Sequence, residues 1–231
     1  MISLLGRLLD VVFPRYCSVC SRRLSVGEQV ICINCNLHLD RTFFSKKPYD
    51  NIMTQRFYHL LPIERSAAIF YYHAGSKVCN IVHDIKYNDM PQSGIIMGHM
   101  AASEVQPDGF FDGIDLIIPM PLAKNRQKER GYNQSDMIAQ GVSEVTHLPI
   151  LTNLVSRDRY KKSQTHLTPV ERLENVEGIF HLKHPEQISG KHILLIDDVC
   201  TTGATLVSLG KELAKAGHVK ISILTLGFSH T

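Results

Sequence analysis

Short apolar runs alternate with amphipathic stretches along most of the chain. The runs have the length and β-branched content of buried strands, and the stretches between them repeat apolar residues at helical spacing. The predicted strands are residues 66–72, 115–118, 150–155, 178–182, 193–197 and 219–226, and the predicted helices are residues 77–87, 95–105, 132–146 and 206–216. This alternation predicts an α/β fold with a doubly wound parallel sheet, whose core strands are residues 115–118, 150–155, 193–197 and 219–226.

The predicted strand 193–197 ends in an unusual polar sequence. Asp197 and Asp198 are adjacent at its end, a turn rich in hydroxyl groups follows (residues 201–205), and a helical run comes next. The backbone N–H groups of such a turn and the positive end of a helix bind anions. Carboxylates accept hydrogen bonds from sugar hydroxyl groups or hold Mg²⁺ through water. The pattern therefore predicts a sugar-phosphate site, with an ordinary buried strand and polar turn as the alternative.

The predicted strand 115–118 also leads into candidate binding residues. It runs directly into the tight loop Pro119-Met120-Pro121-Leu122, and such loops bind ligands at the carboxyl edge of a parallel sheet. In the basic segment that follows, Arg126 and Arg130 are four residues apart, so they share one face of a helix. Arginine suits bidentate phosphate binding. A solvated run of charges is the alternative interpretation of this segment.

Residues 157–172 are rich in charged and hydroxyl side chains. The alternating residues 178–182 that follow them can return as a strand. We therefore expect residues 157–172 to form a mobile lid over the ligand site.

Four cysteines form two closely spaced pairs near the amino terminus, Cys17 with Cys20 and Cys32 with Cys35. Two such pairs supply the four thiolates of a tetrahedral zinc site, and a site with four thiolates has no position open for water. We therefore predict a structural zinc ion, with two disulfides as the alternative. The apolar residues 1–13 precede this module and have the spacing of a short amphipathic helix, with a membrane contact as the alternative.

Composition places limits on the kind of protein. The 231 residues are 44% hydrophobic and 20% charged, which allows a sizeable core. We predict two parts, an amino-terminal helix and zinc-finger module (residues 1–45) and a larger α/β domain (residues 46–231). No segment reads as a membrane span or a signal peptide, so we expect a cytoplasmic protein. The net charge of +3 is compatible with nucleic acid without indicating it.

The acidic strand end resembles the signature of the phosphoribosyltransferases, which bind phosphoribosyl pyrophosphate (PRPP). In that family four apolar residues, two acids and two apolar residues precede Thr-x-Gly-x-Thr, and Asp197, Asp198, Thr201, Gly203 and Thr205 match it. The resemblance implies a type I phosphoribosyltransferase fold, with Asp197 and Asp198 as catalytic residues, residues 119–122 as the pyrophosphate loop, and Mg²⁺ bound with PRPP. It implies that PRPP is bound by Asp197, Asp198, Val199, Cys200, Thr201, Thr202, Gly203, Ala204 and Thr205.

Taken over its whole length, the chain resembles the competence protein F (ComF) family. The shared features are Phe13-Pro14, the two cysteine pairs, Ile85-Lys86-Tyr87, Pro119-Met120-Pro121-Leu122, the series Arg126, Arg130, Gly131, Tyr132, Asn133, Gln134, the series Arg157, Gln164, Arg172, Asn175, and the PRPP loop. The ending Leu226-Gly227-Phe228 departs from the family, which more commonly has Ala-Arg there.

The ComF resemblance implies a role in natural transformation, in the handling of imported single-stranded DNA. Partners would then be PRPP, single-stranded DNA and other competence or DNA-processing proteins, with Lys86, Arg126 and Arg130 contacting either phosphate groups of PRPP or DNA. The alternative is an active phosphoribosyltransferase that acts on a small acceptor in nucleotide or related metabolism. The sequence leaves open whether turnover occurs.

Overall fold

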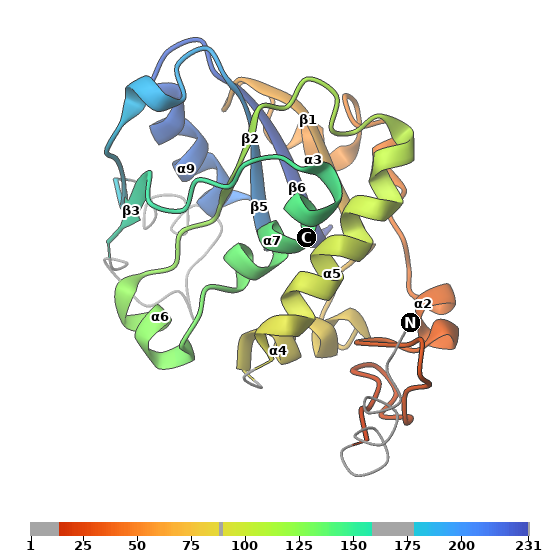
Figure 1. The fold of residues 1–231 in the computed structure, drawn as a ribbon. Helices are drawn as coiled ribbons and strands as arrows, with labels where there is room; N and C mark the ends of the chain where they lie inside the picture. The colour runs from red at the N-terminus through yellow and green to blue at the C-terminus, as the bar shows by residue number, and fades with distance from the viewer. Residues whose placement is uncertain (1–13, 88–89, 159–177, 231) are drawn as a thin grey trace.

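The computed structural model describes residues 14–87, 90–158 and 178–230 (Figure 1). Its centre is a sheet of four strands in the order β1-β6-β5-β2. The strands are β1 (Ile63–Tyr71), β2 (Leu116–Pro119), β5 (His192–Cys200) and β6 (Lys220–Phe228), and every neighbouring pair in the sheet is parallel. The predicted parallel α/β sheet is therefore confirmed.

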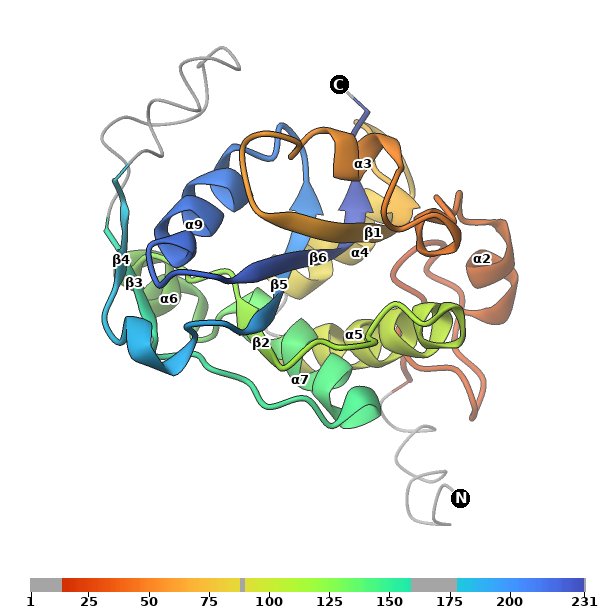
Figure 2. The same cartoon turned by 90° about the horizontal axis from the view of Figure 1, so that it is seen from above.

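Helices cover both faces of this sheet, as Figure 2 shows. On one face lie α5 (Pro91–Val105) and α7 (Gln134–Thr146), and on the other lie α9 (Ala204–Ala214) and the short α3 (Ile52–Gln55). Because both faces are covered, residues 193–196 of the central strand β5 are fully buried, which explains their continuous apolar sequence.

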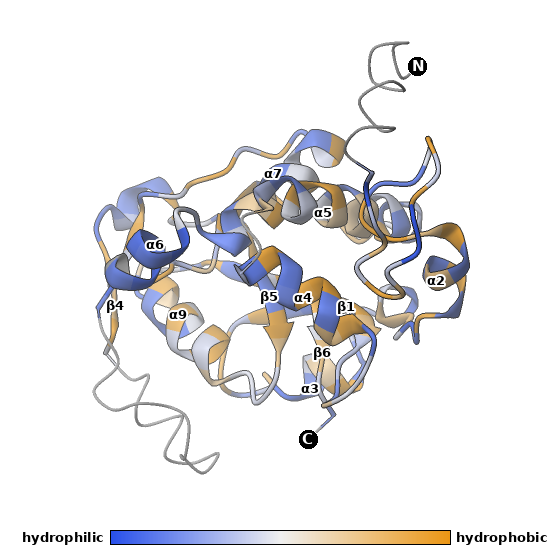
Figure 3. Cartoon of the chain, turned by 90° about the horizontal axis from the view of Figure 1, so that it is seen from below, coloured by the Kyte–Doolittle hydropathy of each residue, from blue (hydrophilic) through white to orange (hydrophobic). Residues whose placement is uncertain are grey.

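The remaining elements lie at the edges and ends of this core. The helix α4 (Val78–Tyr87) lies across the end of the molecule where the strands finish (Figure 3). The others are α2 (Ile33–His38), η1 (Phe44–Lys46), η2 (Gln106–Asp108), α6 (Lys124–Arg130), β3 (Val155–Arg157), β4 (Phe180–Leu182) and η4 (Pro185–Gln187). No helix within the described ranges is long and apolar enough to cross a membrane.

Glycines allow α5 and α7 to pack unusually close together. A Cβ atom at Gly98 would lie 2.1 Å from the carbonyl oxygen of Ile138, and a Cβ atom at Gly141 would lie 1.9 Å from that of Ile95. Real side-chain carbons do not reach such distances, so any larger residue at these positions would push the helices apart. This close contact fixes α7, whose first turn carries a residue of the candidate site.

The prediction of a core strand at residues 150–155 was wrong. Only Ile150 pairs with the sheet, through an isolated parallel bridge to Ile117. The chain then turns away, and residues 155–157 form the antiparallel hairpin of β3 with β4. The returning strand predicted at residues 178–182 is confirmed as β4, while residues 159–172 of the predicted lid lie outside the described residues, as do residues 1–13.

Other predicted bounds needed smaller corrections. The strand β5 continues to Cys200, three residues beyond its predicted end, so Asp198 as well as Asp197 lies within the strand. The helix α9 begins at Ala204, so Thr205 belongs to its first turn and not to the preceding loop.

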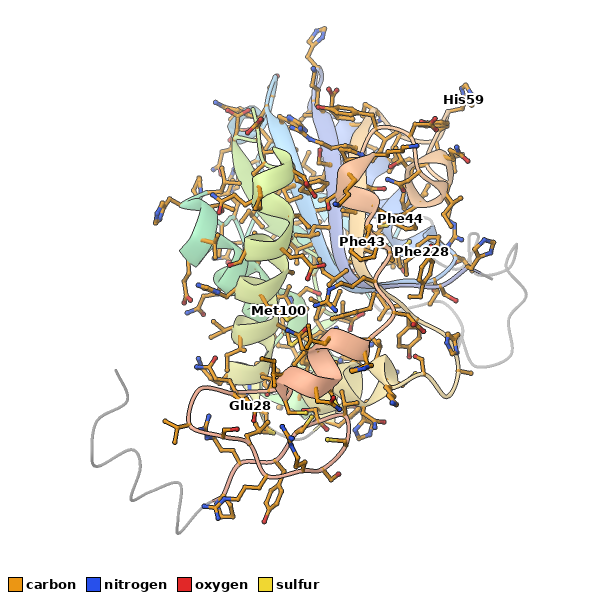
Figure 4. All side chains as sticks on the ribbon, turned by 90° about the vertical axis from the view of Figure 1, so that its right-hand side faces the viewer. Glu28, Phe43, Phe44, His59, Met100 and Phe228 are labelled. Carbon is orange, nitrogen blue, oxygen red and sulfur yellow. The ribbon has the colours of Figure 1, made fainter. Side chains whose placement is uncertain are left out.

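The segment after the cysteine module runs along the outer edge of β1. The N–H group of Thr42 donates to the carbonyl oxygen of Ile69 (3.0 Å), and Arg41 forms an antiparallel bridge with Phe70. Beyond it, the ring of Phe44 packs edge-on against that of Phe228 (5.4 Å between centroids; Figure 4). The division at residue 45 stays a prediction, but residues 41–44 already contact the sheet.

Candidate functional site

The two adjacent carboxylates lie at the carboxyl edge of the sheet, on the central strand β5. Oδ1 of Asp197 accepts hydrogen bonds from Oγ of Ser135 (3.1 Å) and from the N–H group of Asp198 (2.9 Å). Burial, together with the neighbouring charge of Asp198, raises the pKa of Asp197 to about 7. Asp197 therefore changes its charge near neutral pH, so the affinity for any ligand that its carboxylate binds should depend on pH.

A lysine from a distant helix neutralises the second carboxylate. Nζ of Lys86, near the end of α4, lies 2.7 Å from Oδ2 of Asp198, and both side chains are mostly buried. Burial alone would lower the pKa of Lys86, but the charges of Asp198 and Asp197 outweigh burial and raise it. Lys86 is therefore held as a cation beside the acidic pair.

Tyr72 is a further member of this cluster, and sequence reasoning missed it. Burial raises the pKa of its hydroxyl, and the hydroxyl interacts with the thiol of Cys79 and with the charges of Lys86 and Asp198. Nothing in the sequence marked Tyr72, because it stands at the end of an apolar strand that reads as core.

A short loop joins β5 to α9. Gly203 has a φ of +78°, a left-handed conformation that glycine adopts without strain, and α9 begins at the next residue. A Cβ atom at Gly203 would lie 3.0 Å from the ring of Phe57. The loop therefore has no room for a larger residue on the side that faces the protein, which leaves its other side for a ligand.

Arg56 supports this loop from behind. Its guanidinium donates to the carbonyl oxygens of Thr201 and Ser229 and stacks over the ring of Phe228 at 4.5 Å. Cys200, at the base of the loop, is fully buried, and burial raises the pKa of its thiol to about 12. A buried thiol with so high a pKa is a poor nucleophile, so Cys200 contributes shape and not chemistry.

The predicted pyrophosphate loop, residues 119–122, lies next to the acidic pair. The N–H group of Met120 donates to the carbonyl oxygen of Ile196 in β5 (2.8 Å), which fixes the loop to the strand that carries Asp197. Nδ2 of Asn133 donates to the carbonyl oxygen of Met120 (3.1 Å). The structure thus brings residues 119–122 and residues 197–203 to the same edge of the sheet.

Arg157 at the end of β3 also points to this edge. It donates to the carbonyl oxygen of Pro121 (3.0 Å) and stacks over the ring of Phe180 at 5.2 Å. Burial lowers the pKa of Arg157 to about 10, while the charge of Asp197 acts in the opposite direction. The sequence placed Arg157 in a lid and among the residues shared with the ComF family, and did not identify it as a neighbour of Asp197.

The predicted arginines of α6 take different positions. Arg130 donates to Oε1 of Gln134 (2.9 Å) and its guanidinium lies over the ring of Tyr87 at 4.9 Å. Arg126 is exposed and lies close enough to Arg157 to lower its pKa. The helices α6 and α4 lie at the same end of the molecule (Figure 1), and Arg130 also donates to the hydroxyl of Tyr87 in α4 (3.3 Å).

The four cysteines of the amino-terminal module come together in space. Their sulfur atoms all lie within 4.8 Å of one another, and Sγ of Cys20 is 3.9 Å from Sγ of Cys32. Sulfur atoms around a tetrahedral zinc ion are about 3.8 Å apart, given a Zn–S bond of about 2.3 Å. The cluster therefore fits one metal ion bound by four thiolates.

Backbone N–H groups already point at these sulfur atoms. Sγ of Cys17 accepts from the N–H groups of Val19 (3.4 Å) and Cys32 (3.3 Å). Burial raises the pKa of the Cys17 thiol, but these hydrogen bonds outweigh burial and bring it down to about 7. Burial raises the pKa of Cys35. A bound metal ion would stabilise Cys17 and Cys35 as thiolates, because its positive charge attracts the deprotonated sulfur atoms.

Glu28 orders the loop between the two cysteine pairs. Its carboxylate accepts from the N–H groups of Ser25 (2.7 Å) and Ile33 (2.7 Å), from the Ser25 hydroxyl and from Arg22. These hydrogen bonds, the backbone ones first, lower the pKa of Glu28 to about 2. Sequence reasoning did not identify this role of Glu28.

Comparisons with known proteins agree with this geometry. Residues 136–228 match the family model described as the phosphoribosyl transferase domain. The chain is 26% identical over 220 residues to the DNA utilization protein YhgH of Escherichia coli (strain K12), covering 91% of this chain and 88% of that protein.

Two further relatives are competence proteins. Competence protein F of Haemophilus influenzae is 36% identical over 110 residues, which cover 47% of this chain and 48% of that protein. Competence protein ComFC of Bacillus subtilis is 37% identical over 125 residues, which cover 54% of this chain and 47% of that protein. The predicted resemblance to the ComF family is therefore confirmed.

Proposed function

Because the chain is similar to ComF-family proteins and carries a phosphoribosyltransferase-like domain, we propose that it binds PRPP and acts in the handling of single-stranded DNA during natural transformation. The observation that carries the PRPP part is the convergence of the acidic pair, the loop after β5 and residues 119–122 at one sheet edge. The DNA part is supported by the names of its relatives, a DNA utilization protein and two competence proteins.

In this proposal each part of the site binds one part of PRPP. The carboxylates of Asp197 and Asp198 accept hydrogen bonds from the ribose hydroxyl groups. The backbone N–H groups of the loop 201–205, at the start of α9, bind the 5′-phosphate, since a helix N-terminus favours an anion. The loop 119–122 contacts the pyrophosphate.

Cations around the acidic pair complete the site. Lys86 and Arg157 already lie at the carboxylates, and they are placed to contact the negative oxygens of PRPP. Carboxylate oxygens are also the hard donors that Mg²⁺ prefers, so Asp197 and Asp198 fit a magnesium ion that arrives with PRPP and neutralises its pyrophosphate. Arg126 is exposed and free to reach either pyrophosphate or DNA.

The cysteine module serves this function as a folded unit. Its four thiolates hold one zinc ion in our proposal, and a closed site of this kind stabilises structure and does not catalyse. We place the protein in the cytoplasm, where PRPP and imported DNA would meet.

Titration calorimetry with PRPP and Mg²⁺ tests the ligand assignment. We expect heat of binding for the wild type and none for Asp197→Asn combined with Asp198→Asn, which keeps the side-chain volumes. The control is Glu186→Gln, which removes an exposed carboxylate elsewhere and should bind PRPP as the wild type does. Absence of binding by the wild type would refute the assignment.

If PRPP binds, release of pyrophosphate with a panel of amine and base acceptors decides between the two functions. Release that requires an acceptor would establish an active phosphoribosyltransferase. Binding without release would establish PRPP as an effector of a DNA-handling protein.

A further inference from the structure

A polar pocket opens beside the first residues of β1, away from the acidic pair. It has a volume of about 550 Å³ and is lined by residues 45–50, Arg65 and residues 108–109. Lys46 and Lys47 are exposed at its mouth. The acids of the pocket are engaged with neighbours: Oδ2 of Asp108 accepts from Oγ of Ser45 (2.6 Å), and Oδ1 of Asp50 accepts from Nε2 of Gln55 (2.8 Å).

Arg65 is a buried cation in the wall of this pocket. The residue is only 3% exposed. Its guanidinium donates to the hydroxyl of Tyr49 (3.1 Å) and to the carbonyl oxygens of Gly109 and Asp112, all of them uncharged acceptors. Nε has no hydrogen-bond partner, and no carboxylate among the described residues forms an ion pair with Arg65. A buried charge without a counter-ion is costly, so the pocket favours an anion.

Exposed aromatic rings lie next to these cations. Tyr49, whose hydroxyl accepts from Arg65, is 55% exposed, and its carbonyl oxygen accepts from the hydroxyl of Tyr58 (2.7 Å). Phe43 is 60% exposed, and Nζ of Lys46 lies 6.0 Å from the centre of its ring. Phe43 also has a φ of +53°, which is unusual for a bulky residue. Its ring stands outside the core that its neighbour Phe44 enters (Figure 4).

We infer that this surface, formed by Phe43, Lys46, Lys47, Tyr49 and Arg65, binds single-stranded nucleic acid. Lys46 and Lys47 contact phosphates, the charge of the buried Arg65 attracts them from the pocket wall, and the rings of Tyr49 and Phe43 stack on bases. Cations that alternate with exposed rings are the arrangement that binds single strands without sequence preference. A single strand fits this surface better than a free phosphate ion, which would use the cations but not the rings. It also fits better than a duplex, whose stacked bases cannot stack on protein rings.

The inference rests on the DNA part of the proposed function and adds the location of the contact. It puts DNA on the outer side of the edge strand β1, along residues 43–49, and PRPP at the carboxyl end of the central strand β5. Both ligands can therefore be bound at the same time.

Fluorescence anisotropy with a labelled oligothymidylate of about 20 nucleotides, which exceeds one typical site size, tests the surface in the full chain. Lys46→Ala with Lys47→Ala should weaken binding and reduce the slope of log affinity against log salt by about 1.4, or about 0.7 for each lost phosphate contact. Tyr49→Ala should weaken binding about tenfold because it removes a stacking ring. Tyr49→Phe keeps the ring and should bind within about twofold of the wild type.

The matched control is Lys183→Ala with Lys211→Ala, which removes two exposed lysines elsewhere and should leave the affinity and salt slope close to the wild-type values. Equal losses of affinity in the control and in the Lys46 and Lys47 double variant would refute the proposed surface, because binding would then depend on net charge alone. Wild-type binding that survives both the lysine and the Tyr49→Ala changes would overturn the surface and leave the DNA function in place. No binding by the wild type would refute both.

Discussion

Replacing Lys86 by methionine tests how the acidic pair is held in the folded protein. The change keeps an apolar stem of similar length and removes the ammonium group that lies 2.7 Å from Oδ2 of Asp198. Removing one partner of a fully buried ion pair costs about 3–5 kcal/mol, because the other charge stays buried without compensation. The side chains of Lys86 and Asp198 are 24% and 8% exposed, so we expect a smaller loss of about 2–3 kcal/mol at pH 8.

The loss should depend on pH, with a sign that the structure fixes. Burial and the charge of Asp198 raise the pKa of Asp197 to about 7 from an ordinary value of 3.8. Between these two values the folded state binds the proton more tightly than the unfolded state, so Asp197 stabilises the fold at low pH and loses that contribution as the pH rises through 7. Without Lys86 the two carboxylates hold a proton more tightly still. The difference between Lys86→Met and the wild type should therefore shrink from pH 8 to pH 5.5.

Urea unfolding followed by circular dichroism at both pH values measures this effect. Adding Asp198→Asn to Lys86→Met removes the uncompensated charge, so the double variant should be more stable at pH 8 than Lys86→Met alone. Lys211→Met, at an exposed position, should stay within about 0.5 kcal/mol of the wild type. A loss below about 0.5 kcal/mol for Lys86→Met, or a loss equal at both pH values, would refute the account of the pair.

Four further predictions test other parts of the structure. Gly98→Ala should lower the free energy of unfolding by about 3 kcal/mol in urea unfolding, because the new Cβ atom meets a carbonyl oxygen of α7. The control Gly27→Ala, which has open space around it, should cost less than about 0.5 kcal/mol. Equal costs for the two variants would contradict the close packing of α5 and α7. Cys35→Ser should reduce bound zinc from about one ion per chain, measured by plasma mass spectrometry, and unchanged zinc would exclude the four-thiolate site. Gly203→Ala should cost about 1–2 kcal/mol of left-handed backbone strain and weaken PRPP binding in calorimetry; unchanged binding would show that the loop is not part of the site. PRPP affinity should rise about tenfold from pH 6 to pH 8, as Asp197 with a pKa of about 7 becomes ionised, and an affinity that is flat or falls over this range would contradict a role for its carboxylate.

The parts of the site that are local in sequence could be predicted from it. The apolar run of β5, the acidic pair and the glycine loop are consecutive, and each follows from rules that act over a few residues. The same holds for the cysteine pairs, whose spacing brings their sulfur atoms together. The position of loop 119–122 at the carboxyl edge could be predicted because parallel strands end at the same edge of a sheet, while its role as a pyrophosphate loop stays a prediction.

The parts that depend on contacts between distant segments could not be predicted. Lys86 was selected as a phosphate contact, but nothing in its own segment indicated an ion pair with Asp198. The positions of Tyr72 and Arg157 at the site depend on where two other elements end in space. The error at residues 150–155 has a similar cause, because an apolar run at the sheet edge can pair through a single residue and then turn away.

The partnership of Arg65 with Tyr49 was also hidden in the sequence. The sequence places Phe43 and Tyr49 close to Lys46 and Lys47, but nothing in it connects these residues with Arg65. The fold brings the ring of Tyr49 to the guanidinium of Arg65 and leaves that ring exposed beside Lys46 and Lys47. The fold therefore adds one buried cation to a surface whose other members are neighbours in the sequence.

Hydrogen–deuterium exchange of the full chain with and without PRPP and Mg²⁺ tests the central claim most directly. If PRPP binds at the carboxyl edge of the sheet, peptides that contain residues 196–207 should exchange more slowly with the ligand present. Peptides that contain residues 43–50, on the outer side of β1, should be unchanged. Protection of residues 43–50 without protection of residues 196–207 would place PRPP in the other pocket and contradict the account.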